Sequence, residues 1–127
     1  MNGNSSSPTA EEQRALDAVD IDGVLADLAE LVAIPSVGGT EAEQQAQHWC
    51  ADKLASLGYQ VDHWRYEVPD LAAHPDFPGQ EVERDTGYGC VGVSSTAGTP
   101  ALVFYGHTDV VPPGDLELWP NRDPYAL

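Results

Sequence analysis

Residues 101–115 have the sequence ALVFYGHTDVVPPGD, and the fold that we expect for the whole chain depends on them. The first part, Ala101–Tyr105, is a continuous apolar run that ends at Gly106, which is typical of a strand buried on both faces of a sheet. His107 and Asp109 follow directly, and residues two apart in an extended backbone point to the same side. The stretch therefore predicts a buried strand that ends in a pocket shared by an imidazole and a carboxylate.

This pair of side chains suggests a metal site. A neutral imidazole is a common zinc ligand, and a neighbouring carboxylate can hold the ring in one tautomer and raise its basicity. The Pro-Pro-Gly segment at residues 112–114 gives the motif a rigid exit. The alternative is that His107 and Asp109 form only a hydrogen-bonded turn, as most H-x-D pairs do.

Two helices are expected before the motif. Over residues 20–34 apolar side chains recur at helical spacing, with an aspartate placed to cap the helix and a proline placed to end it. Thr40 and Glu43 predict a capping box at the start of a second helix, which ends at Gly58. An extended link, residues 34–37, joins the two. We expect both helices to cover a sheet.

Three strands are predicted for that sheet. Residues 59–66 and 88–93 have strand-like composition, and the turn-forming residues 94–100 would pair the second strand antiparallel with a third at residues 101–105. The predicted class is therefore α/β, with helices covering a mixed sheet.

A second H-x-D motif lies in the long polar segment between the first two strands. His74 and Asp76 flank a proline, and no buried strand leads into them. We interpret this pair as an ordinary turn. Asp115, Glu117 and Asp123 lie near the first motif and are likewise predicted to be turn and surface residues.

Composition limits the classes of partner. The 127 residues include 21 acidic and five basic side chains, a formal charge of −16, which disfavours binding to nucleic acid and to anionic membranes. Cys50 and Cys90 have no C-x-x-C spacing, so we expect two buried, reduced thiols and no zinc knuckle. The first residues lack the features of a secretory signal and no apolar run could span a bilayer, so we expect a cytoplasmic protein with a flexible polar tail at residues 1–15.

The segment GHTDVVPPGD, followed by Trp119 and Asp123-Pro124-Tyr125, resembles the first metal-ligand motif of a superfamily of zinc-dependent amidohydrolases. This superfamily comprises the acetylornithine deacetylases, succinyl-diaminopimelate desuccinylases, aminoacylases and glutamate carboxypeptidases. The resemblance implies the start of a zinc-exopeptidase-like mixed sheet with covering helices, truncated before the sheet and the site are complete. It makes residues 16–127 the N-terminal part of the catalytic, metal-binding domain, without the lid and dimerisation domain.

The resemblance also implies roles for two residues. His107 would bind one of two zinc ions, with cobalt or manganese as substitutes, and Asp109 would be the catalytic residue that orients the imidazole. The bridging aspartate, the general-base glutamate and the other ligands of the superfamily lie downstream of this motif. We therefore expect this 127-residue fragment to be inactive alone.

The function implied is hydrolysis of the amide bond of an N-acyl amino acid, as in a deacetylase or desuccinylase. A carnosinase-like dipeptidase or a carboxypeptidase acting on short peptides is the alternative within the superfamily, but the wording TDVVPPGD is closer to the deacylases. The complete enzyme would be a homodimer. Two alternatives from another class are a non-catalytic binding or scaffold remnant and one half of a split enzyme.

Overall fold

A computed structural model describes residues 7–94, 98–100 and 102–127. The helices and strands follow one another as α1 (Ala10–Asp17), α2 (Ile21–Val32), α3 (Glu41–Ser56), β1 (Gln60–Glu67), α4 (Val68–Ala72) and β2 (Thr86–Val93), and two short 3-10 helices, η1 (Leu116–Leu118) and η2 (Pro120–Arg122), come last. β1 and β2 pair antiparallel along their full length, with Gln60 opposite Val93 and Glu67 opposite Thr86. The architecture is mixed α/β, as predicted, and both predicted strands before residue 94 are confirmed.

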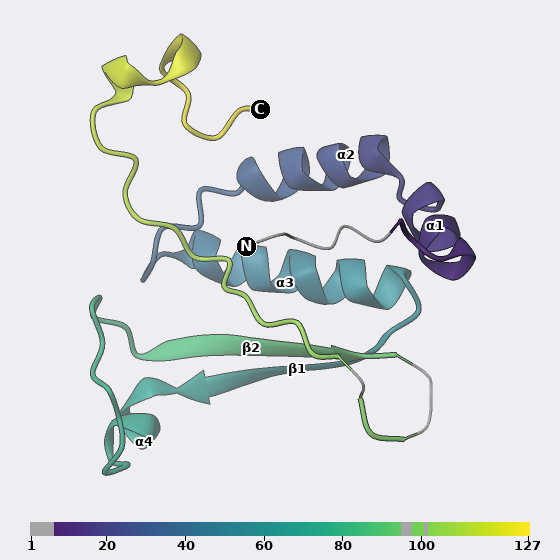
Figure 1. Cartoon of the computed structure of the whole chain (residues 1–127). Coiled ribbons are helices and arrows are strands. Elements are labelled where there is room, and N and C mark those ends of the chain that lie inside the picture. The colour runs from purple at the N-terminus through teal and green to yellow at the C-terminus, as the bar shows by residue number, and fades with distance from the viewer. Residues whose placement is uncertain (1–6, 95–97, 101) are drawn as a thin grey trace, which may run out of the picture.

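The helix α3 lies against one face of the two-stranded sheet (Figure 1). Its two buried side chains, Ala46 and Ala51, are both small. Gly92 of β2 lies beneath Leu54, because a Cβ built on the glycine would be 3.1 Å from a methyl group of that leucine. The close approach of α3 to the sheet at this point therefore depends on the glycine in β2.

The helix α2 lies beside α3 on the side away from the sheet (Figure 1). The side chain of Asp20 caps it by accepting a hydrogen bond from the backbone N–H of Gly23 at 3.0 Å, as predicted. Two polar contacts join it to α3: an ion pair between Asp27 and Lys53, and a hydrogen bond from the indole N–H of Trp49 to Glu30. None of the helices in the described part of the chain is long and apolar enough to cross a membrane.

The capping box predicted for α3 is wrong. Thr40 is the N-cap residue, but its hydroxyl donates to the carbonyl of Val37 at 2.6 Å and does not accept a bond from the helix. Glu43 accepts from the N–H of Gly39 at 2.7 Å instead of from Thr40, and its other oxygen pairs with Arg84. The glutamate is turned toward the arginine, so it does not close a box around the cap.

The predicted third strand is also wrong. Ala101 lies outside the described residues, and Leu102, Val103, Phe104 and Tyr105 have irregular backbone with exposed fractions of 69, 76, 89 and 98%. A buried strand needs a hydrogen-bonding neighbour and cover on both faces. Within the described residues β2 pairs only with β1, and no element covers this apolar run.

The N-terminal region differs from the expected tail as well. Residues 10–15 belong to α1, which begins at a capping box between Thr9 and Glu12, with the two hydrogen bonds at 3.2 and 2.6 Å. All of α1 is exposed. Local capping therefore forms this helix in a segment whose composition predicted a flexible tail, while residues 1–6 lie outside the described part of the chain.

Candidate functional site

The link that follows α2 holds the motif in place. The N–H of Val110 donates to the carbonyl of Ser36 at 3.0 Å, and the N–H of Gly38 donates to the carbonyl of Val110 at 3.2 Å. Val37 and Val110 thereby form a parallel β-bridge. The short link therefore supplies the backbone partner of the motif at Val110.

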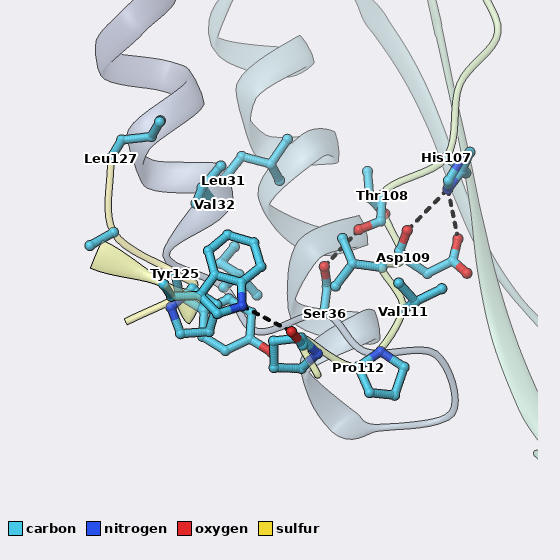
Figure 2. A pocket seen from close by; sticks show the side chains of 16 residues that line it. Leu31, Val32, Ser36, His107, Thr108, Asp109, Val111, Pro112, Tyr125 and Leu127 are labelled. Atoms are coloured by element: carbon cyan, nitrogen blue, oxygen red, sulfur yellow. Dashed lines mark hydrogen bonds and ion pairs between the residues drawn. The ribbon is translucent and has the colours of Figure 1, made fainter. Parts of the chain in front are cut away.

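Two side chains add to this attachment. Ser36 is 3% exposed, and its hydroxyl donates to the carbonyl of Thr108 at 2.6 Å, as Figure 2 shows. The side-chain amide of Gln47, on α3, donates to the hydroxyl of Thr108 at 3.0 Å. The residue between the histidine and the aspartate is therefore held by both the link and the helix.

His107 and Asp109 are in contact, as predicted. The Nδ1 atom of the imidazole lies 3.2 Å from Oδ1 of Asp109 and 3.0 Å from the carbonyl oxygen of the same residue (Figure 2). Both neighbours are acceptors, so they favour the neutral tautomer that carries its proton on Nδ1. The lone pair then lies on Nε2, which accepts no hydrogen bond from any described residue. The His107 side chain is 78% exposed, so Nε2 is accessible.

This geometry fits one metal ligand and the carboxylate that orients it. A catalytic zinc ion usually takes three protein ligands and keeps one position open. Among the described residues, however, no three histidine, cysteine, aspartate or glutamate side chains come together in a way that could hold a metal ion. The pair can supply one ligand, and a complete site would need further donors.

A groove of about 660 Å³ opens beside the pair, between the end of α2 and the last residues of the chain. Its walls are mainly apolar and include Leu31, Val32, Val111 and Tyr125 (Figure 2). Trp119 also lines the groove. The indole N–H of Trp119 donates to the carbonyl of Pro113 at 2.9 Å, which folds the C-terminal segment back toward the motif. From the sequence we identified the link at residues 34–37 and the aromatic residues Trp119 and Tyr125, but we did not predict that they would line the same groove.

In the second H-x-D motif the Nδ1 atom of the histidine accepts a hydrogen bond, whereas in the first motif Nδ1 faces two acceptors. The backbone N–H of Asp76 donates to Nδ1 of His74 at 3.2 Å, so this ring carries its lone pair on Nδ1. The Asp76 carboxylate lies 3.9 Å away and is 91% exposed. The pair is an ordinary turn, as predicted.

The three other carboxylates near the motif are also turn residues, as predicted. Asp115 accepts from the N–H of Glu117 at 3.0 Å, and Asp123 accepts from the N–H of Tyr125 at 2.9 Å. Glu117 forms an ion pair with Arg122 at 2.8 Å. All three are therefore engaged in local contacts.

The two cysteines are free thiols that are half-buried, less buried than predicted. Burial raises the pKa of Cys50, and the neighbouring Cys90 raises it further. Burial also raises the pKa of Cys90, with a smaller contribution from Asp62. Both thiols therefore stay protonated at neutral pH.

Several curated proteins that are similar to this chain carry the same name. The succinyl-diaminopimelate desuccinylase of Stenotrophomonas maltophilia is 39% identical over 99 residues, which make up 76% of this chain and 20% of the relative. The proteins of the same name from Methylorubrum extorquens and Acinetobacter baumannii are 39 and 34% identical, over 70 and 76% of this chain and 19 and 20% of their own lengths. The chain thus spans about a fifth of the length of these relatives. No family model and no solved structure matches the chain.

Proposed function

The chain is homologous to the succinyl-diaminopimelate desuccinylases over about three quarters of its length, and we therefore propose that it carries the first metal-ligand motif of a deacylating amidohydrolase. The reaction is hydrolysis of the amide bond that joins an acyl group to an amino acid. The observation that carries the proposal is the contact between Nδ1 of His107 and the Asp109 carboxylate, which leaves Nε2 free.

In this proposal His107 holds the metal through Nε2. Asp109 holds the Nδ1 proton in a hydrogen bond, which fixes the tautomer that places the lone pair on the accessible nitrogen, Nε2. Ser36 and Gln47 hold the backbone and side chain of Thr108, which keeps the two site residues at a fixed separation. Zinc is the metal that we propose, and when bound it lowers the pKa of a water molecule to about 7 and polarises the scissile carbonyl.

The substrate class follows from the names of the relatives. We propose an N-succinyl or N-acetyl amino acid as substrate, with a short peptide as the alternative. We also propose a second zinc ion and a general base. The ligands of that ion and the base must be residues other than His107. The cytoplasmic location and the homodimer stay predictions.

A chimaera tests this function. The segment of the Stenotrophomonas maltophilia desuccinylase that aligns with this chain would be replaced by the residues of this chain, and hydrolysis of succinyl-diaminopimelate and N-acetylornithine would be measured with zinc. We expect hydrolysis of at least one substrate, its loss in the His107→Ala variant and its retention in His74→Ala. A chimaera that is folded and binds zinc but hydrolyses neither substrate would contradict the proposed activity. Equal rates in the two variants would contradict the role of His107.

A further inference from the structure

The two carboxylate oxygens of Asp109 have different surroundings. Oδ1 faces the imidazole of His107 at 3.2 Å. Oδ2 lies on the other side, where a Cβ built on Gly38 would be 3.7 Å from it and 3.6 Å from Nη2 of Arg84. The carboxylate and the guanidinium therefore border the same small space, which is open because residue 38 is a glycine.

Arg84 is held in this position by α3. Its Nη1 forms an ion pair with Glu43, and the two side chains are only 22 and 18% exposed. The second oxygen of Glu43 accepts from the N–H of Gly39 at 2.7 Å, so the same glutamate also anchors the turn beside Gly38. One arm of the guanidinium is thus fixed by the helix, and the other borders the space at Gly38 that Asp109 also borders.

The position of Arg84 matters because the chain has few basic residues. The chain has 21 acidic and five basic residues, and the other four basic residues, Arg14, Lys53, Arg65 and Arg122, each pair with an acidic residue outside the motif. Arg84 differs from these four because its second arm borders the space at Gly38 that the Asp109 carboxylate also borders. Attraction between opposite charges is screened less strongly for half-buried groups than for exposed ones.

We propose that Arg84 is a positioning residue for Asp109. Its free arm draws Oδ2 toward Gly38, and this keeps Oδ1 on the Nδ1 atom of His107. The effect on metal binding rests on the proposed function, but the orientation of Asp109 is a property of this chain alone. Gly38 takes part because a side chain larger than alanine would fill the space between the two charged groups.

The orientation of Asp109 can be measured directly by NMR. Three-bond couplings from Cγ to the backbone nitrogen and carbonyl carbon report whether χ1 occupies one rotamer or several. We expect one dominant rotamer in the wild type and in Arg84→Lys, which keeps the charge, and averaged couplings in Arg84→Gln. The control Arg65→Gln, which breaks the exposed pair with Glu67, should leave the couplings unchanged.

A charge swap separates positioning from a merely structural ion pair. The double variant Glu43→Arg with Arg84→Glu can re-form the pair but brings a negative group toward Asp109. We expect this variant to keep the exchange protection of the β1–β2 amides and still to show averaged Asp109 couplings. A single rotamer in the double variant, or in Arg84→Gln, would overturn the proposal.

Zinc titration of the same samples keeps the two proposals distinguishable. If the wild type binds zinc at His107, we expect Arg84→Gln to bind it about tenfold more weakly, at the low end of the effect of removing an orienting partner. A wild-type chain that binds no zinc at His107 would count against the metal-ligand role, while the couplings alone would still decide the role of Arg84. Unchanged couplings with zinc bound at His107 would overturn the role of Arg84 and leave the proposed function standing.

Discussion

The Nδ1 atom of His107 lies 3.2 Å from Oδ1 of Asp109 and 3.0 Å from the main-chain oxygen of the same residue. One of these acceptors is charged and the other is part of the backbone, so a substitution can remove the first and keep the second. The contribution of the carboxylate charge can therefore be measured without losing every partner of the imidazole.

In the chimaera, where the remaining part of the enzyme can supply further ligands, Asp109→Asn is expected to weaken zinc binding by about 10–100-fold, because the neutral amide raises the basicity of the imidazole less than the carboxylate does. A competition titration against a zinc indicator measures the change. The control Asp76→Asn alters the other H-x-D motif and should leave the affinity unchanged. Equal affinities in the wild type and Asp109→Asn would show that the carboxylate does not act on the ligand.

Ser36→Ala is expected to lower the free energy of unfolding by about 1–3 kcal/mol, because it leaves the carbonyl of Thr108 without its buried partner. Urea denaturation measures this loss, and hydrogen exchange at the N–H of Val110 should speed up as the link loosens. Ser56→Ala is the control, since Ser56 makes a similar bond to Lys53 on an exposed surface. Comparable losses in the two variants would mean that burial of Ser36 adds nothing.

Gly39→Ala is expected to destabilise the turn before α3 more than Gly58→Ala destabilises the turn after it. Both glycines have positive φ, +80° and +84°, so alanine is strained at each by about 1 kcal/mol. Only at residue 39 would the new Cβ also meet a neighbour, Cγ1 of Val82 at 2.5 Å. Thermal unfolding of the two variants measures the difference, and equal losses would show that Val82 moves aside without cost.

The thiols are expected to ionise only at high pH in the folded chain. Because the pKa of Cys50 and Cys90 is raised above the ordinary value of 9.0, the unfolded chain loses these protons first as the pH rises. Stability should therefore be unaffected below pH 9.0 and should fall as the pH rises above it. Alkylation rates by iodoacetamide between pH 7 and 11 measure the ionisation. A midpoint for the folded chain at or below that of the urea-unfolded chain would contradict the shift.

The sequence predicted the elements that depend on local signals. The helix α2 and both strands were predicted because capping, periodicity and composition act within each segment. Residues 102–105 were mispredicted as a buried strand, because burial depends on neighbours that an apolar run does not itself specify. The box at Thr40 failed for a related reason, since the Glu43 partner, Arg84, lies 41 positions further along the chain.

The site was predicted in part. The contact between His107 and Asp109 follows from their spacing, and the structure confirms it. The support that Ser36 and Gln47 give to Thr108 comes from two distant segments, and a motif of ten residues contains no signal for such contacts.

Nitrogen NMR of the histidine side chains during zinc titration tests the central claim most directly. The four histidines can be observed separately, and a weak site with a single protein ligand still changes the shift of the nitrogen that binds. We predict that Nε2 of His107 responds at the lowest zinc concentration while its Nδ1 stays protonated, and that His74 responds later. Zinc binding first at His74, or at Nδ1 of His107, would contradict the assignment of His107 as the metal ligand.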